Sequence, residues 1–148
     1  MSESIQTQMS EGLKGENLKS ENIQMICTVN NRAKQELKVQ SKDLDWGKFT
    51  AEPVAIPSKA VLPAFRSTGR QGSASGTQGK VVYQIGDDAA AIITISGDVP
   101  WAPGASNKVT TSTFSEDVGA SIAGFVGSGP VESVTITVVD GRGAVAVS

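Results

Sequence analysis

The longest alternation of apolar and polar residues in the chain is Val131-Glu132-Ser133-Val134-Thr135-Ile136-Thr137-Val138. A period of two is typical of a β-strand that buries one face and exposes the other. Asp140-Gly141 follows and is a favoured two-residue turn for reversing a strand. This part of the chain therefore predicts a half-buried strand in an antiparallel sheet.

Five shorter runs combine β-branched and polar residues in the same way. They are residues 23–29, 36–40, 80–85, 89–96 and 108–114. Asn30-Asn31 supplies a polar turn between the first two runs, so we expect them to pair as an antiparallel hairpin. Together the runs predict about eight short strands.

The segments between these runs predict connections and a tail. Residues 52–57 contain two prolines, which argues for a connection or an edge strand and against a central strand. Residues 69–79 are the most glycine-dense stretch and predict a long surface loop, a place where function is often carried. Residues 1–22 have little to bury, so we expect a flexible N-terminal tail before a domain spanning residues 23–148.

Size and composition narrow the fold class. A chain of 148 residues suits one domain with a real hydrophobic core. Hydrophobic residues at 39% and charged residues at 19% argue against wholesale disorder and against a membrane span. Glycines and prolines spread between short β-branched runs favour many turns over long helices. We therefore expect an all-β protein, a single-domain antiparallel β-sandwich.

The charge balance argues against a nucleic-acid partner. Residues 1–22 contain four Glu and two Lys, which accounts for the whole net charge of −2 and leaves residues 23–148 neutral. Nucleic-acid binding depends mainly on Lys and Arg that neutralise phosphates, so DNA and RNA are not expected as partners. The first residues have neither a positive start nor an apolar run, which predicts cytosolic synthesis without a signal peptide. Later release and action at membranes stay open.

The chemistry of the side chains argues against an enzyme. The chain has no histidine and a single cysteine, Cys27, which we expect to be buried in the first strand. Catalytic triads, Cys/His pairs and zinc sites are thereby excluded. Three carboxylate pairs remain, and they adjoin turn residues, where acidic side chains commonly cap the chain. They are Asp43/Asp45, Asp87/Asp88 and Glu116/Asp117. We expect no catalysis, metal or cofactor, and an enzyme built on Asp87/Asp88 is the least favoured reading.

Five stretches, taken in chain order, resemble the aegerolysin family of small β-sandwich proteins from fungi and bacteria. They are residues 25–31 with Lys38-Val39-Gln40, Asp45-Trp46-Gly47-Lys48-Phe49, Gly69-Arg70 with Ser75-Gly76-Thr77-Gln78-Gly79-Lys80, Asp98-Val99-Pro100-Trp101, and residues 124–138, which are similar to the family's closing strand pair. The resemblance covers about residues 23–141. It implies a sandwich related in shape to actinoporin-type cytolysins.

The resemblance also implies a function. Aegerolysins recognise membrane lipids, typically in sphingolipid-containing or sterol-rich membranes, and some are haemolytic, insecticidal or pore-forming with a perforin-like partner protein. Carried onto this chain, the family implies these lipid-binding residues: Trp46, Lys48, Arg70, Ser75, Thr77 and Trp101. A Trp ring suits the boundary between head groups and acyl chains. Both tryptophans can instead plug the core; the corner after Pro100 favours exposure of Trp101, and nothing decides for Trp46.

The sequence departs from the family in ways that bear on specificity. Aromatic residues are only 5% of the chain, whereas many aegerolysins are rich in Trp and Tyr. Ser75 stands where sphingolipid-binding members often have an acidic residue, and Val99 stands where a Cys often precedes Pro-Trp. The lipid therefore does not follow from the resemblance. A lectin-like or protein-binding β-sandwich without membrane activity is the alternative function.

Overall fold

The computed structural model describes residues 22–70, 75–102, 104–114 and 118–140, and these residues form nine strands. The predicted all-β class is thereby confirmed. The strands are β1 (Gln24–Asn31), β2 (Leu37–Trp46), β3 (Lys48–Ala51), β4 (Val61–Thr68), β5 (Thr77–Ile85), β6 (Ile92–Val99), β7 (Lys108–Thr113), β8 (Val118–Ala123) and β9 (Val131–Asp140).

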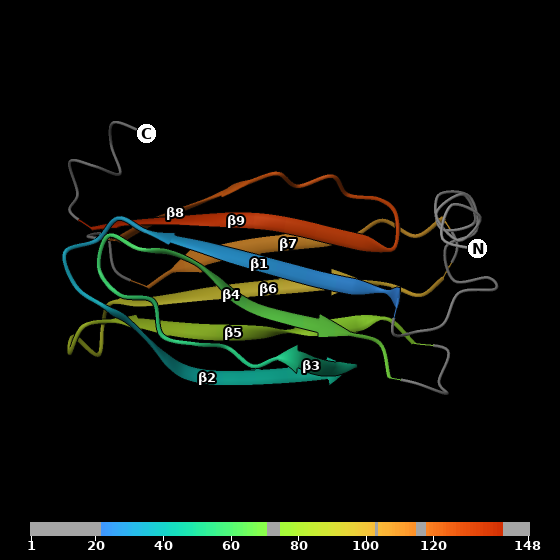
Figure 1. Cartoon of the computed structure of the whole chain (residues 1–148), viewed down its shortest axis with the longest axis horizontal. Helices are drawn as coiled ribbons and strands as arrows, with labels where there is room; N and C mark the ends of the chain where they lie inside the picture. Colours follow the sequence, from blue (N-terminus) through green and yellow to red (C-terminus); the bar gives the residue numbers. More distant parts are fainter. Residues whose placement is uncertain (1–21, 71–74, 103, 115–117, 141–148) are drawn as a thin grey trace.

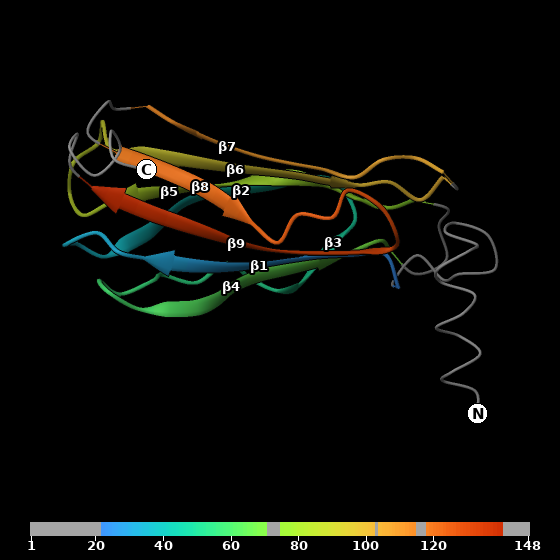
Figure 2. The same cartoon turned by 90° about the horizontal axis from the view of Figure 1, so that it is seen from above.

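The strands form two sheets that pack face to face. One sheet has the order β3-β4-β1-β9-β8 and the other β2-β5-β6-β7. Figure 2 shows the two layers edge-on, with β5, β6 and β7 in one and β1, β4 and β9 in the other. All pairings are antiparallel except that of β1 with β9, which is parallel. The predicted antiparallel sandwich is confirmed, with one parallel pair at the centre of its larger sheet.

The core lies between the layers and follows the alternation in the sequence. Along β9, Val134, Ile136 and Val138 are buried while Ser133 and Thr135 face away from the core. β1 contributes Cys27, which is fully buried as predicted, and burial raises the pKa of its thiol to about 12. Each strand of the centre thus buries every second side chain, as expected for a sheet covered on one face.

The predicted hairpin of β1 with β2 is wrong, because the two strands lie in different sheets. β1 is flanked by β4 and β9, and β2 pairs with β5. Each strand has one apolar face, and placing the strands in opposite layers lets both faces point into the same core. The segment between them, residues 32–36, crosses from one layer to the other.

β4 is a strand that the sequence pattern does not predict, because Pro63 interrupts it. Proline is tolerated there for two reasons. Pro63 sits at a β-bulge against β1, where Ala64 is the extra residue. In addition, β3 pairs only with Arg66, Ser67 and Thr68, so β4 has no neighbour in the sheet beside Pro63 on that side.

The proline-containing segment at residues 52–57 is a connection, as predicted. Ile56 makes one isolated bridge to Leu37, with backbone hydrogen bonds of 2.9 and 3.0 Å. The buried Tyr83 hydroxyl donates to the Val54 carbonyl at 2.8 Å. These bonds hold the segment against the edge of the four-stranded sheet.

Several predicted boundaries need correction. The loop expected over residues 69–79 ends earlier, since β5 begins at Thr77. The run at residues 89–96 becomes a strand only from Ile92, because residues 86–91 form turns. Residues 124–130 are a loop, and the first strand of the closing pair, β8, precedes them. The tail before Asn22, Gly141 of the predicted turn, and Glu116/Asp117 lie outside the described residues.

The antiparallel arrangement collects the loops at two ends of the sandwich. We call one the tryptophan end: it holds the corner at Trp46–Lys48, residues 69–70 and 75–76, the β6–β7 loop and the β8–β9 loop. It is on the right in Figure 1. The other, the asparagine end, holds Asn31 with residues 32–36, the β5–β6 turn and the ends of β7 and β9.

Candidate functional site

A β-bulge presents Trp46 to solvent. In regular alternation Trp46 would share the inward face of β2 with Leu44, but the register shifts between these residues and leaves Asp45 as the extra one. Trp46 therefore stands opposite Gln78, and directly paired residues share a face of the sheet. The Trp46 side chain is 59% exposed. The structure thus places Trp46 in solvent, a question that the sequence left open.

A glycine corner follows Trp46 directly. Gly47 has a φ of 95°, a left-handed conformation that other residues rarely adopt, and a Cβ there would lie 2.3 Å from the Thr68 carbonyl oxygen. At this corner the chain leaves the four-stranded sheet and enters β3 of the other sheet. Gly47 thereby sets Trp46 at the extreme end of β2.

Trp101 lies at a second corner, directly after β6. Its side chain is half-buried and packs against the hydrophobic core. The partial exposure expected of Trp101 is observed, although Trp46 is the more exposed of the two. Trp101 combines both roles that the sequence allowed, because one part of its ring contacts the core and the rest faces outward.

The two tryptophans line one shallow pocket of about 400 Å³, which we call the tryptophan pocket. Ser75, Gly76 and Thr77 form a wall of this pocket, and Asp98 through Ala102 form another. The loop before β5 comes very close to the end of β6: a Cβ at Gly76 would lie 2.0 Å from the Val99 carbonyl oxygen. Gly76 is therefore required for the two walls to meet.

Thr77 supports the pocket from below. Its side chain is 2% exposed, and its hydroxyl donates to Ser67 Oγ at 2.7 Å. This hydroxyl bridges the two sheets, because Ser67 belongs to β4 and Thr77 to β5. Of the predicted site residues, Trp46, Ser75, Thr77 and Trp101 come together, and Thr77 is placed to hold the wall in position.

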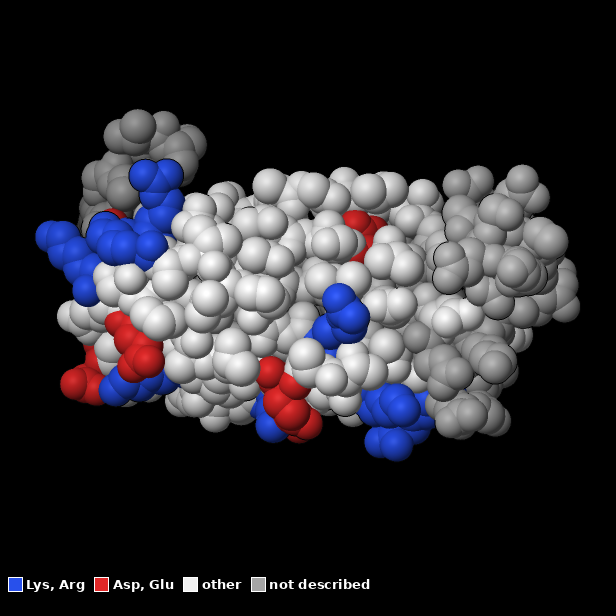
Figure 3. All heavy atoms as spheres, viewed as in Figure 1, with Lys and Arg blue, Asp and Glu red and all other residues white. Residues whose placement is uncertain are grey.

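The other two predicted residues lie at the same end without lining the pocket. Lys48 is exposed on β3 and stands opposite Thr68 of β4. Arg70 is also exposed and lies two residues after Thr68. Figure 3 shows charged side chains along the lower edge of this view and at its left, while the middle of the face over β1 and β9 carries few. Lys48 and Arg70 thus place positive charge beside the tryptophan end.

Further apolar side chains extend this end beyond the tryptophans. Phe125 is 46% exposed and Val126 is 70% exposed, and both lie in the β8–β9 loop. Of the seven large hydrophobic side chains exposed among the described residues, four lie at the tryptophan end: Trp46, Phe125, Val126 and Val131. Phe114 and Val61 are exposed at the asparagine end.

A fully buried carboxylate holds the β8–β9 loop in place. Glu132 accepts hydrogen bonds from the backbone N–H of Val126 (2.7 Å), the backbone N–H of Gly127 (2.8 Å) and Asn107 Nδ2 (3.0 Å). Asn107 also donates from its backbone N–H to the Gly127 carbonyl. The exposed Phe125 and Val126 are therefore fixed to the loop that carries Trp101.

Sequence reasoning missed some of these residues. Asp98 and Gln78 line the tryptophan pocket, and both stand inside motifs quoted for the family resemblance, so a signal was present. Phe125, Val126 and Glu132 also lie in a quoted stretch, residues 124–138, but nothing in that stretch marked them as site residues. An acidic residue on the inward face of a strand interrupts the expected apolar pattern, and its role becomes clear only when the loop that it binds is known.

Asp87 and Asp88 each make a local contact, whereas Asp43 and Asp45 form none within the described residues. Asp87 pairs with Lys38 at 2.6 Å, and this hydrogen bond lowers the pKa of the Asp87 carboxyl. Asp88 Oδ1 accepts from the backbone N–H of Ala90 and closes a turn. Across the described ranges no three Cys, Asp or Glu side chains gather in a way that would hold a metal ion. In the same ranges no helix has the length and apolar character needed to cross a membrane.

Comparison with solved structures finds the same fold in other proteins, including RahU, IP-1A and Nakanori. RahU, solved in complex with a Tris molecule, aligns with a TM-score of 0.65 and 23% identity over 81% of this chain and 96% of its own. IP-1A from Alcaligenes faecalis gives a TM-score of 0.66 and 22% identity over 82% and 94%. Nakanori, described as a lipid-binding protein, gives a TM-score of 0.63 and 16% identity over 94% and 80%.

Comparison with protein sequences assigns the family. No curated protein matches the chain. The family model described as Aegerolysin matches residues 21–141, a span that contains every described strand and both walls of the tryptophan pocket. The chain therefore belongs to the aegerolysin family.

Proposed function

We propose that this protein binds membrane lipids and docks onto the bilayer with its tryptophan end. The observation that carries the proposal is the exposed Trp46 beside the half-buried Trp101 on a shared pocket at the tip of the sandwich. The family and the lipid-binding description of Nakanori support it.

The chemistry of the two rings suits a membrane interface. An indole has an apolar body and one N–H donor, and it is enriched where head groups meet acyl chains. Trp46 keeps more than half of its surface in water, so the free protein leaves apolar area available for burial. Trp101 is anchored in the core on one side, so the pocket wall that it forms is rigid.

The surroundings of the pocket add to this contact. Phe125 and Val126 offer a second apolar contact at the same end, and their loop is fixed through Glu132. Lys48 and Arg70 place positive charge where lipid phosphates would lie. Several contacts at one end are consistent with binding to a surface more than to a small free molecule.

The finer assignments are proposals that follow from the family. We propose sphingolipid-containing or sterol-rich membranes as the target, and lysis or pore formation only together with a perforin-like partner protein. Ser75, in the place of an acidic residue, lines the pocket and is the position at which we expect lipid choice to differ from that of other aegerolysins. Synthesis in the cytosol, followed by release and action at membranes, stays a prediction.

Flotation with vesicles tests the proposal. The full chain is mixed with phosphatidylcholine vesicles that contain sphingomyelin, cholesterol or both, and Trp46→Ala is compared with the parent. We expect Trp46→Ala to weaken retention by about tenfold, because one exposed ring loses about 1–2 kcal/mol of burial in the interface. With Trp101→Phe in place, the emission of Trp46 should shift to the blue on binding.

Phe114→Ala is the matched control, since Phe114 is an even more exposed aromatic residue, at 78% against 59% for Trp46, and lies at the asparagine end. Its retention should equal that of the parent. If no vesicle composition retains the parent protein, or if both variants lose binding equally, lipid docking through the tryptophan end is refuted.

A further inference from the structure

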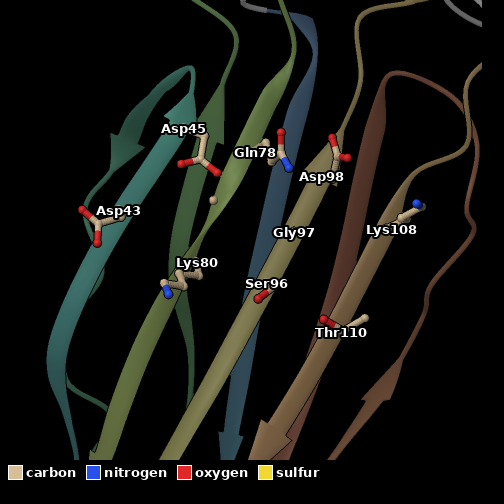
Figure 4. A pocket seen from close by; sticks show the side chains of 10 residues that line it. Asp43, Asp45, Gln78, Lys80, Ser96, Gly97, Asp98, Lys108 and Thr110 are labelled. Atoms are coloured by element: carbon tan, nitrogen blue, oxygen red, sulfur yellow. The ribbon is translucent and has the colours of Figure 1, made fainter.

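A second depression lies on the outer face of the four-stranded sheet and adjoins the tryptophan pocket. It has a volume of about 440 Å³ and shares two lining residues, Gln78 and Asp98, with that pocket. We call it the polar trough. Figure 4 shows it crossing all four strands. A molecule with a polar part and an apolar part can therefore contact the second depression and the tryptophan pocket at the same time.

The trough is built from two rows of polar side chains. In the first rung, Gln78 pairs in register with Asp98 and Asp98 with Lys108, and Asp45 completes the row in Figure 4. The second rung is Asp43, Lys80, Ser96 and Thr110, each directly opposite the next. The rungs are two residues apart on each strand, or about 7 Å. That spacing matches the width of one sugar ring.

The charged groups of the trough are not engaged with one another. Lys80 stands between Asp43 and Ser96, and Asp98 stands between Gln78 and Lys108. Within the described part of the chain, none of the carboxylates and ammonium groups of the trough forms a hydrogen bond or an ion pair. By contrast, Lys38 and Lys42 on the same sheet both pair with carboxylates. The trough therefore presents ready donors and acceptors side by side.

The balance of charge selects the kind of ligand. Three carboxylates and two ammonium groups give the trough a net charge of −1, which disfavours an anionic head group. The carboxylates do not form a cation site either, since no metal-holding group occurs in the described ranges. Alternating acceptors and donors suit hydroxyl groups, which both donate and accept. Carboxylates and ammonium groups form the stronger, charge-assisted bonds to them.

We infer that the polar trough binds a neutral, hydroxyl-rich head group, a sugar ring, whose lipid part lies against the tryptophan pocket. This inference rests on the proposed function and names the chemical class of the lipid. Trp46, opposite Gln78, lines the adjoining tryptophan pocket at the membrane side of the trough, and we expect its ring to contact the apolar face of the sugar. Asp43 and Lys80 bind the hydroxyls furthest from the bilayer.

Vesicles that differ only in the head group test the inference. Phosphatidylcholine vesicles carry ceramide, glucosylceramide, galactosylceramide or lactosylceramide, and an array of free neutral oligosaccharides is run in parallel. We expect at least one glycosylceramide to raise retention above ceramide. The double variant Asp43→Ala, Lys80→Ala should remove that gain, a loss of about tenfold, while binding to ceramide vesicles is unchanged. Both residues are exposed, so the fold should tolerate the change.

The matched control, Lys38→Ala, Asp87→Ala, removes one positive and one negative charge from β2 and the β5–β6 turn, and it should keep the gain. Binding of free oligosaccharides on the array would identify a soluble glycan as a source of the same chemistry. If no neutral glycan on lipid or array is preferred, or if sphingomyelin alone raises retention and the trough variant keeps it, the inference is wrong. If the parent protein binds none of the vesicles, the proposed function itself is overturned.

Discussion

At the asparagine end of the sandwich polar side chains close the space between the sheets, whereas at the tryptophan end a polar network fixes a loop that leaves apolar side chains in solvent. Asn31 is fully buried and donates from Nδ2 to the carbonyls of Gln35, Ile56 and Pro57 at 3.0 to 3.1 Å. Its Oδ1 accepts from the backbone N–H of Ala33. Glu132 forms a similar network at the other end, but the loop that it holds exposes Phe125 and Val126.

The comparison shows how one scaffold separates stability from recognition. Bonds at the asparagine end join segments that are distant in the sequence, since Asn31 is 25 residues from Ile56 and Lys34 is 106 residues from Asp140. These bonds serve the fold. Exposed large apolar side chains are more numerous at the tryptophan end, four against two; there they contribute nothing to the fold and are typical of a binding surface.

The largest effect should come from Asn31→Ala. It removes four hydrogen bonds at a fully buried position, so we expect the free energy of unfolding to fall by about 3–4 kcal/mol. Denaturant unfolding measures it, and vesicle binding of the folded fraction should not change. Asn30→Ala, on the outward face of the same strand, is the control and should cost less than about 1 kcal/mol. An equal loss in both variants would contradict the role of the Asn31 network.

Glu132→Ala should rank second, at about 2–3 kcal/mol, because it leaves two backbone N–H groups and the Asn107 amide without their acceptor. Here vesicle retention should fall as well, since the loop with Phe125 and Val126 loses its anchor. Hydrogen exchange at Val126 and Gly127 measures the release of the loop. Slow exchange at both amides in the variant would show that the carboxylate does not hold them.

Replacing the two tryptophans should change the stability of the protein by different amounts, whereas both replacements should weaken vesicle binding. Trp101 packs on the core, so Trp101→Ala should cost about 2 kcal/mol, less than the loss for a fully buried Trp. Trp46→Ala should cost no more than about 0.5 kcal/mol, as for an ordinary surface change. Thermal unfolding of both variants measures this, alongside flotation. Equal stability losses would place the two rings in equivalent environments, against the structure.

The core shared by both ends should make the protein sensitive to alkaline pH. The Cys27 thiol has a pKa of 9.0 in the unfolded chain and about 12 in the fold, because burial disfavours the thiolate. Below the lower value both states are protonated and stability is unaffected. Above it only the unfolded chain releases its proton, so the free energy of unfolding should fall by about 1.4 kcal/mol at about pH 10. Urea unfolding between about pH 8 and about pH 10 measures the slope.

Cys27→Ala is the control for this slope and should remove most of it. A small slope should remain near about pH 10, because burial also raises the pKa of the Tyr83 hydroxyl. In the native parent, iodoacetamide should react with Cys27 only at the rate of unfolding, since the side chain is fully buried. Rapid alkylation under native conditions would contradict the buried position.

The smallest effect is expected at the ion pair of Lys38 with Asp87. Both groups are solvent-exposed, and exposed pairs contribute little because water and salt screen them. Lys38→Ala should leave the melting temperature unchanged at low and at high salt. A clear, salt-dependent fall would show that electrostatic contacts on the four-stranded sheet stabilise the fold more than this comparison assumes.

Much of the fold was readable from local pattern. Period-two alternation at residues 131–138 predicted β9 and its buried face, and the run around Cys27 predicted β1 and the burial of that thiol. The two prolines of residues 52–57 predicted a connection. Ordered motifs at Trp46 and Trp101 indicated the family and two residues of the tryptophan pocket. Each of these signals depends on residues that are close together in the chain, so it can be read from a single sequence.

Other features exist only in the assembled sheets. Whether β1 pairs with β2 or faces it across the core depends on which arrangement buries both apolar faces, a property of two layers together. A one-residue bulge at Asp45, visible only against β5, turns Trp46 from the inward to the outward face. The polar trough takes its eight polar side chains from four strands whose register the sequence does not encode locally. Composition and alternation thus determined the fold class, the ordered motifs indicated the family, and strand register decided which side chains meet at the surface.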